Sequence, residues 1–446
     1  MLKNKYVASF FFGFIGGFAF PPLYLLFFLP FSFDYLLTNL KEFNYKTAIL
    51  FAFGYYLPQL YWVSFSLLVD KSFLWLFPFA SVFVPLACSI YLTFAILILQ
   101  KMNIKNRLLK SVCFAFLYVF FEYLRGLIFP WNFIAYTLAF SDALIQSASI
   151  FNIYVFDFIV VVFFCFWHVM ELKLDKECFS SFKNIKICYL PIYLFIFSFI
   201  LIFGLIRLER METVRLSKKI LLVQANIKQD LKWVTDELYN NVKKHIDISD
   251  KQEADVIIWA ESSIPFTLTS DTVLSGEFER IKNKILISGA NRKSVRGYYN
   301  SIFIFENNKV VDFYDKIKLV PFGEFMPLPF INKITSSIDF LRGDSNRTIY
   351  VDEYFKIKPL ICYEIAFPNL MIDKNDRPDA IVNLTNDAWF GDTSGPYQHL
   401  VAAKFRAIEN KIPVIRVANT GISVYINEYG VIENKINLNE SGFILK

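Results

Sequence analysis

The sequence predicts a polytopic α-helical membrane domain over residues 1–212, followed by a mixed α/β domain over residues 213–446. Composition divides the chain at this point, because 38 of the 52 Phe lie before residue 210 but only 11 of the 40 acidic residues lie before residue 213. Long apolar stretches dominate the first part, whereas short strand-like runs alternate with helical patterns in the second. A length of 446 residues is also enough for two domains.

Seven apolar stretches predict the membrane domain, since a helix needs about 20 mostly apolar residues to cross a bilayer. They cover residues 6–20, 22–38, 47–69, 72–100, 111–129, 143–170 and 187–206. Pro21 and Pro22 predict a tight turn between the first two stretches, unless these form one broken segment. Glu122 and Arg125, at the end of the fifth stretch, are either functional charges or an interfacial ion pair.

Loop charge predicts the orientation of these spans. The N-terminus and the loops 39–46, 101–110 and 171–186 together carry 12 Lys and Arg residues, whereas the opposite short loops hold only Lys71 and Arg125. We therefore expect a cytoplasmic N-terminus and an extracytoplasmic second domain. In a bacterium, this places residues 213–446 on the periplasmic side of the inner membrane.

The second domain reads as sheets covered by helices. The expected strands are Ile220–Val223, Val256–Trp259, Ile285–Ser288, Ser301–Phe305, Pro359–Cys362, Ala380–Leu384 and Pro413–Val417. Helices are predicted over 233–249 and 396–410, and Asn427–Gly430 predicts a turn between two final strands.

Charge and cysteine usage exclude several classes of site. Residues 213–446 hold 30 basic and 29 acidic residues, so this domain offers no nucleic-acid surface. Five of the six cysteines lie in or beside apolar segments, where they pack as small hydrophobes: Cys88, Cys113, Cys165, Cys178 and Cys188. Without a CxxC pair or a Cys/His cluster, neither a disulfide framework nor a metal site is predicted.

Three residues suggest acyl transfer through a thioester. Glu261 and Cys362 each end an apolar run, and Lys316 follows Tyr314-Asp. A cysteine attacks acyl groups as the thiolate and therefore needs a base, for which Glu261 is the candidate. Lys316 would stabilise the thiolate and the developing oxyanion. Each residue alone is more often structural or solvated, so residue type by itself leaves that alternative open.

The stretches around these residues resemble a known family. Trp259-Ala-Glu-Ser262, Tyr314-Asp-Lys316 with Leu319–Glu324, and Ile361-Cys-Tyr-Glu364 resemble the three motifs of the nitrilase superfamily, most closely those of its membrane branch, the apolipoprotein N-acyltransferases. Further similar stretches are Gln224–Asn226, Lys232-Trp233, Tyr299-Asn300, Asn386–Gly391, Gly395–His399, Arg406–Glu409, Asn419–Gly421, Phe121–Gly126 and Pro130-Trp131. The resemblance covers nearly the whole chain.

This resemblance implies an αββα sandwich in which Cys362 is the nucleophile, Glu261 the general base and Lys316 the oxyanion stabiliser. It places Glu324 and Glu364 close to the site, where we expect them to hold Lys316 and the cysteine loop. The Tyr363 N–H would be a second oxyanion donor. The supporting residues it implies are Trp233, Asn300 and Trp389.

The implied reaction is ping-pong and requires no metal or organic cofactor. Cys362 takes an acyl chain from a phospholipid, with phosphatidylethanolamine as the expected donor. The thioester then acylates the α-amine of the N-terminal diacylglyceryl-cysteine of a lipoprotein. One alternative is a membrane-tethered amidase of the nitrilase type that hydrolyses a small amide with the same three residues. Another is a non-enzymatic membrane scaffold or transporter.

Residues 320–331 are unusual because they combine three Pro and one Gly with mostly apolar side chains. We hypothesise that this loop dips into the leaflet and guides acyl chains to Cys362. Its entrance residues would be Phe322, Phe325, Met326 and Leu328, and Trp389-Phe390 would line the same entrance. The alternative is a loop that packs on its own domain.

Overall fold

The computed structural model describes residues 4–69, 71–170, 189–325, 339–368, 370, 372 and 375–446. The chain forms two compact units. Unit 1 comprises Met1–Met211 with Thr393–Val401, and unit 2 comprises Glu212–Asp392 with Ala402–Lys446.

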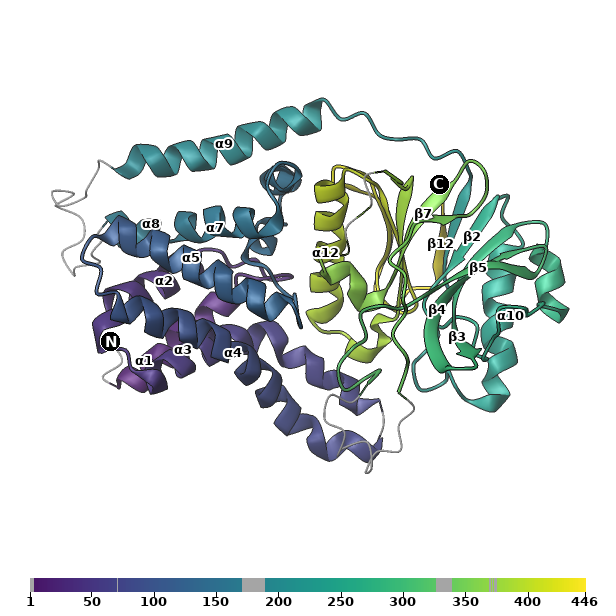
Figure 1. Cartoon of the computed structure of the whole chain (residues 1–446), viewed down its shortest axis with the longest axis horizontal. Coiled ribbons are helices and arrows are strands. Elements are labelled where there is room, and N and C mark those ends of the chain that lie inside the picture. Colours follow the sequence, from purple (N-terminus) through teal and green to yellow (C-terminus); the bar gives the residue numbers. More distant parts are fainter. Residues whose placement is uncertain are drawn as a thin grey trace. The chain divides into compact units, whose positions relative to one another are not determined.

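Within the described residues, the regular elements of unit 1 are all helices, joined by turns and loops (Figure 1). Its α-helices are α1 (Lys5–Gly17), α2 (Phe28–Thr38), α3 (Tyr45–Leu60), α4 (Phe77–Lys101), α5 (Arg107–Gly126), α6 (Asp142–Ile145), α7 (Ile153–Phe164), α8 (Phe166–Met170) and α9 (Leu190–Glu209). Short 3₁₀ segments connect them: η1 (Leu40–Glu42), η2 (Tyr61–Leu68), η3 (Lys71–Leu76), η4 (Ile134–Leu138) and η5 (Gln146–Ser149).

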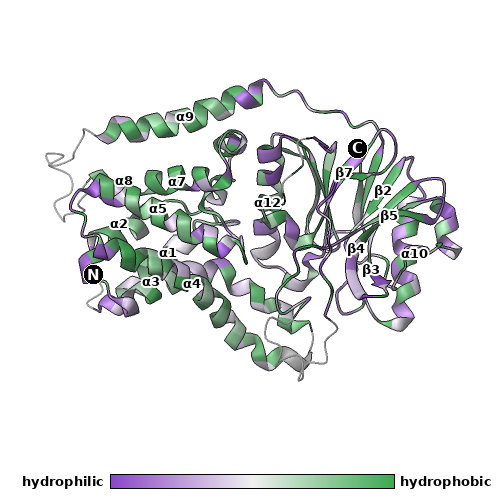
Figure 2. Ribbon diagram, in the orientation of Figure 1, coloured by the Kyte–Doolittle hydropathy of each residue, from purple (hydrophilic) through white to green (hydrophobic). Residues whose placement is uncertain are grey.

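Within the described residues, three helical segments are long and apolar enough to cross a membrane, rather than the expected seven. They are Leu74–Lys101, Ile153–Met170 and Leu190–Glu209. Figure 2 shows the apolar character of α9 along most of its length. The helices α1, α2 and α3 have only 13, 11 and 16 residues, and α5 includes four charged residues among its 20.

Local signals explain where these helices stop. Pro58 lies in the last turn of α3, and the chain continues as the 3₁₀ segment η2 because a proline removes a helix hydrogen bond. The predicted span 143–170 is divided because Asn152 caps α7 by accepting a hydrogen bond from the Val155 N–H. Pro21 and Pro22 lie in a turn between α1 and α2, as predicted.

The Glu122–Arg125 pair is buried inside unit 1. Glu122 is 2% exposed and Arg125 is 1% exposed, and the two side chains form an ion pair. The Tyr56 hydroxyl donates to Glu122 over 2.5 Å, and the Arg125 guanidinium donates to the carbonyl oxygens of Phe129 and Trp131, each over 2.7 Å. The pair therefore fixes the segment that follows α5.

Gln398 belongs to the Thr393–Val401 stretch of unit 1 and ties it to two tryptophans. Its side-chain oxygen accepts from the indole N–H groups of Trp62 and Trp131, each over 3.0 Å. Its amide nitrogen donates to the Pro21 carbonyl over 3.2 Å. These buried hydrogen bonds explain why a stretch so late in the sequence groups with unit 1.

Unit 2 contains two six-stranded sheets that share a core. The first sheet has the order β12-β1-β2-β3-β4-β5 and the second has the order β11-β10-β9-β8-β7-β6. The strands are β1 (Ile220–Gln224), β2 (Val256–Trp259), β3 (Ile285–Ser294), β4 (Gly297–Glu306), β5 (Lys309–Asp315), β6 (Ile349–Tyr350), β7 (Lys356–Ile361), β8 (Ala380–Thr385), β9 (Val414–Ala418), β10 (Ser423–Ile426), β11 (Ile432–Ile436) and β12 (Gly442–Leu445). The strands β1, β2 and β3 are parallel, as are β7, β8 and β9.

Alternation along the strands builds the layers. Ile220 and Leu222 of β1 point into a core that also contains Ile357, Val382 and Ile415 of the second sheet. The intervening Leu221 and Val223 pack instead with Val242 and Ile246 of α10 (Leu238–Ser249) and with Phe278 of η8 (Gly276–Ile281).

Helices cover both outer faces of the two sheets. Of α12 (Gly395–Asn410), residues 402–410 belong to unit 2, and Figure 1 shows them beside the second sheet, on the side opposite α10. The unit is therefore a helix–sheet–sheet–helix sandwich.

The predicted strand cores are confirmed, but several boundaries differ: β3 and β4 are longer than predicted, and β9 begins one residue later. Helix α10 begins at Leu238 after the 3₁₀ turn η7 (Thr235–Glu237), rather than at residue 233. The turn at Asn427–Gly430 does join two antiparallel strands, but these are not the last ones, because β12 follows and pairs with β1. Strand β7 ends at Ile361, so Cys362 lies outside it and begins the short helix η9 (Cys362–Ala366).

Candidate active site

Glu261 lies two residues beyond the end of β2, where the chain turns sharply. Ser262 has a φ of +49°, a conformation that non-glycine residues rarely adopt. Gly289 of the neighbouring β3 allows this turn, since a Cβ there would lie 2.4 Å from the Ser262 nitrogen and 2.7 Å from the Glu261 Cα. The carboxylate of Glu261 is consequently held inside the unit, with 7% exposure.

Lys316 follows β5 and is almost completely buried between two carboxylates. Its ammonium lies 2.9 Å from Glu324 Oε1 and 3.7 Å from Glu261 Oε1. Burial lowers the pKa of Lys316, but Glu324 and then Glu261 more than offset this, so the pKa lies above its usual value. Lys316 is therefore a fixed positive charge at neutral pH.

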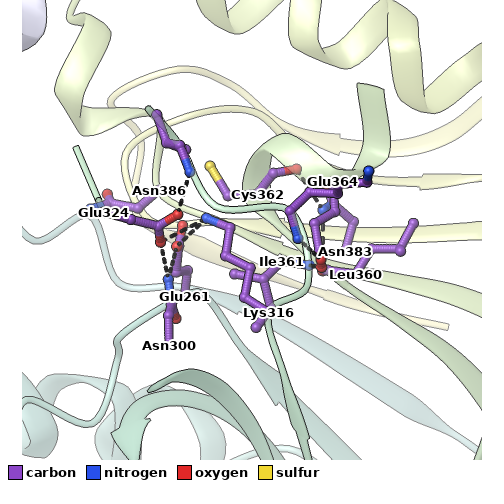
Figure 3. Close-up of polar contacts among 12 residues, drawn as sticks. Glu261, Asn300, Lys316, Glu324, Leu360, Ile361, Cys362, Glu364, Asn383 and Asn386 are labelled. Carbon is purple, nitrogen blue, oxygen red and sulfur yellow. Dashed lines mark hydrogen bonds and ion pairs between the residues drawn. The ribbon is translucent and has the colours of Figure 1, made fainter. Parts of the chain in front are cut away.

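Asn300 of β4 connects the two carboxylates. Its side-chain amide donates to Glu261 Oε1 and to Glu324 Oε1, each over 2.8 Å. Its main-chain carbonyl accepts from the main-chain N–H of Lys316 over 2.9 Å. Figure 3 shows Glu261, Asn300, Lys316 and Glu324 converging, with the Cys362 side chain beside them. The structure thus brings together four of the predicted residues and places the nucleophile candidate next to them.

Cys362 occupies a strained position directly after β7. Its φ is +50°, which costs a non-glycine residue about 1–3 kcal/mol and is characteristic of functional turns. Burial and then the nearby Glu261 carboxylate raise the pKa of the thiol to about 12, although Lys316 acts in the opposite direction. A thiol in this state needs a proton acceptor at the moment of attack, and Glu261 is close enough to influence it.

Glu364 holds the lysine and cysteine segments to each other. Its carboxylate accepts from the N–H groups of Ile317, Lys318 and Ile361 over 2.7, 3.0 and 2.8 Å, and from the Tyr314 hydroxyl. Ile317 and Lys318 directly follow Lys316, whereas Ile361 directly precedes Cys362. These are the contacts expected of a residue that holds Lys316 and the cysteine loop in place.

A buried network beneath Cys362 was not predicted. The Asn383 amide donates to the Cys362 carbonyl over 3.2 Å, and Arg416 donates to Asn383 Oδ1 over 2.7 Å. The same guanidinium pairs with Asp387 over 2.6 Å, and both partners are completely buried. The available signal was a polar residue inside each of two apolar strands, because Asn383 and Arg416 are register partners on β8 and β9 and Asp387 follows β8.

The remaining supporting residues do not join this cluster through the contacts described. Trp233 is 46% exposed and Trp389, in η10 (Asp387–Phe390), is 38% exposed. Tyr363 is buried and packs edge-on against Phe367. Their parts in the reaction remain predictions.

The described part of the entrance loop is a tight turn around Glu324. Phe322 is 53% exposed with a φ of +64°, and its N–H donates to the Phe325 carbonyl over 2.8 Å. Glu324 Oε2 accepts from the Val320 N–H over 2.8 Å. Met326 and Leu328 lie outside the described residues.

Among the residues that the structure describes, no cluster of His, Cys, Asp and Glu has the composition of a metal site. The three residues predicted as nucleophile, proton acceptor and cation, namely Cys362, Glu261 and Lys316, lie side by side in one buried region. Such a set supports covalent acyl transfer.

Comparisons with known proteins agree with both units. Residues 219–445 match the carbon-nitrogen hydrolase family, and residues 12–166 match the apolipoprotein N-acyltransferase N-terminal domain. Apolipoprotein N-acyltransferases from Rickettsia prowazekii and Rickettsia typhi are 36% and 35% identical, each over all of this chain and 92% of the relative. A third, from Rhizobium rhizogenes, is 30% identical over 90% of this chain and 79% of the relative.

Proposed function

The chain belongs to the apolipoprotein N-acyltransferase family, and from this premise we propose that it N-acylates lipoproteins through a thioester on Cys362. The observation that carries the mechanism is the single buried cluster of Glu261, Lys316 and Glu324 beside Cys362. Its residue types and spacing are those of acyl transfer.

In the first half-reaction, Glu261 removes the thiol proton as the Cys362 sulfur attacks the ester carbonyl of a phospholipid. Lys316 and the Tyr363 N–H stabilise the oxyanion. The tetrahedral intermediate then collapses, the C–O bond breaks, and the departing alkoxide takes the proton from Glu261. The products are the Cys362 thioester and a lysophospholipid, with phosphatidylethanolamine as the proposed donor.

In the second half-reaction, the α-amine of a diacylglyceryl-cysteine attacks the thioester carbonyl. Glu261 accepts a proton from the amine, the C–S bond breaks, and the thiolate recovers a proton from Glu261. The product is an amide, and the enzyme returns to its starting state. Since the thioester is the shared intermediate, donor and acceptor need not be bound together.

We also propose a location in the bacterial inner membrane, with several spans and with residues 213–446 on the periplasmic side. The support is the excess of Lys and Arg on one set of loops, together with the three long apolar helical segments found among the described residues. A phospholipid donor and a lipid-bearing acceptor both fit an enzyme held at a membrane.

The deciding experiment is intact mass spectrometry after incubation with phosphatidylethanolamine, on wild type, Cys362→Ala and Cys113→Ala. Cys113 is a second free cysteine, in α5, and its variant is the matched control. We expect a hydroxylamine-labile acyl adduct on wild type and Cys113→Ala only, with release of lysophospholipid. A folded wild type without an adduct would refute the phospholipid half-reaction and favour a small-amide hydrolase, which direct amide hydrolysis assays would then test.

A further inference from the structure

Lys232 is a buried lysine at Glu261 that the mechanism above does not use. Its side chain is 4% exposed, and its ammonium donates to the Glu261 carbonyl oxygen over 2.9 Å. Asn241 of α10 holds the lysine segment in turn, by donating to the carbonyl oxygens of Leu231 and Lys232. The position of this ammonium is thus set by the fold and not by a flexible surface chain.

The charges around Cys362 explain why a second cation is placed here. Glu324 lies 2.9 Å from the Lys316 ammonium, and Asp387 lies 2.6 Å from the Arg416 guanidinium. Glu261 is the more distant partner of Lys316, at 3.7 Å. When Glu261 and Cys362 exchange a proton, one negative charge moves between them, and the positive charges of Lys232 and Lys316 both act on it.

We propose that Lys232 is a positioning residue, which fixes the main chain of Glu261 and whose positive charge stabilises the negative charge shared by Glu261 and Cys362. This inference rests on the proposed function of those two residues. It assigns Lys232 no contact with either substrate, so its effect is on the acylation step rather than on substrate binding.

The surroundings of Lys232 make its charge testable through pH. Burial lowers the pKa of Lys232 to about 8, although Glu261 and Cys362 act to raise it. His245 of α10 lines the same small pocket, and burial lowers its pKa to about 4, so it is neutral above pH 6. Lys316 has a raised pKa and stays charged. Of Lys232, His245 and Lys316, Lys232 is the one expected to lose its charge between pH 7 and 9.

The test is the rate at which iodoacetamide alkylates Cys362, followed on the Cys362 peptide by mass spectrometry between pH 6 and 10 in the full chain. A nearby opposite charge shifts a pKa by about one unit or more, so Lys232→Met should react about tenfold or more slowly than wild type below pH 7.5. Above pH 9 the two rates should converge, because wild-type Lys232 is then neutral as well. Lys232→Arg keeps its charge and should stay above both.

Lys284→Met is the matched control, because Lys284 also donates to main-chain carbonyls, those of Ser249 and Gln252, but at a different place in the unit. It should follow the wild-type curve. A Lys232→Met curve identical to wild type would overturn the proposal. A deficit that stays constant up to pH 10 would overturn the electrostatic part, since a purely structural loss does not depend on the charge of Lys232.

Two features keep the test decisive. If Lys232→Met fails to fold, the wild-type alkylation rate must still rise less steeply with pH near pH 8 than the rate of Lys232→Arg does. The absence of that difference would refute the proposal. Alkylation requires no lipid, so a failure of the phosphatidylethanolamine half-reaction and a failure of the Lys232 inference are separate results.

Discussion

Replacing Glu364 with Gln tests whether one buried carboxylate holds the two catalytic segments in register. Glu364 is completely buried and accepts three main-chain N–H groups, two from the Lys316 segment and one from the Cys362 segment. Gln has nearly the same shape but only one oxygen, so the substitution changes the hydrogen bonding and leaves the packing in place.

The magnitude follows from the donors. If the Gln oxygen keeps the N–H groups of Ile317 and Lys318, its NH₂ group faces the N–H of Ile361, and two donors oppose each other. A hydrogen bond to a charged group contributes about 1.5–3 kcal/mol, and an unpaired buried donor costs about 1–3 kcal/mol. Burial raises the pKa of Glu364, which shows that the charge is costly to bury, and Gln removes that cost. We therefore expect a net loss of about 2–4 kcal/mol in the free energy of unfolding.

Two measurements check this expectation. The melting temperature of the catalytic unit should fall by about 4–16 °C, because each kcal/mol lowers it by about 2–4 °C in a unit of this size. The rate of acyl-enzyme formation should fall about 10²-fold or more, because the carboxylate of Glu364 no longer holds the Lys316 segment to the Cys362 segment. Tyr314→Phe is the matched control, because it removes only the hydroxyl that donates to Glu364 over 3.1 Å and should cost about 1 kcal/mol. A Glu364→Gln protein as stable and as active as Tyr314→Phe would refute the reasoning.

Two further predictions concern the same site. Asn300→Asp should slow acyl-enzyme formation more than Asn300→Ala does, by about tenfold or more, because it places a third carboxylate against Glu261 and Glu324; equal rates in the two variants would contradict this. Phe322→Asp should reduce acylation by phospholipid vesicles several-fold while leaving the alkylation of Cys362 unchanged, and Tyr354→Asp, at a side chain that is 72% exposed, is its control. Unchanged vesicle acylation would count against the entrance hypothesis.

Periodicity and strand-end motifs predicted much of unit 2. Buried parallel strands are continuous apolar runs, so β1, β2, β7, β8 and β9 were recognisable from their residues alone. The motif residues at strand ends do meet, but they come from both sheets: Glu261 follows β2 and Lys316 follows β5 of the first sheet, whereas Cys362 follows β7 of the second. Their meeting therefore depends on how the two sheets pack across the shared core. Three edge strands were missed: β6 and β12 have only two and four residues, and the seven residues of β5 include Lys309, Asp312 and Asp315, which hide its strand character.

Other features depend on contacts that composition does not encode. The helix boundaries in unit 1 follow single residues such as Pro58 and Asn152, which an apolar average over 20 residues does not detect. The network of Asn383, Asp387 and Arg416 joins residues about 30 positions apart, and only the β8–β9 register brings them together. The left-handed backbone at Ser262 and Cys362 likewise follows from strand ends that sequence can locate but whose geometry it cannot supply.

The hydrogen bonds also distinguish the two carboxylates beside Lys316, which are those of Glu324 and Glu261. Glu324 is held by three fixed donors, namely the Lys316 ammonium, the Asn300 amide and the Val320 N–H. A carboxylate bound this firmly serves as a permanent counter-charge for Lys316. Glu261 also accepts from the Asn300 amide, but its carboxylate lies farther from Lys316. Lys232 donates a hydrogen bond to the main-chain carbonyl of Glu261, not to its carboxylate. A general base must release and regain a proton in every half-reaction, and the carboxylate with the looser set of donors is the one suited to do so.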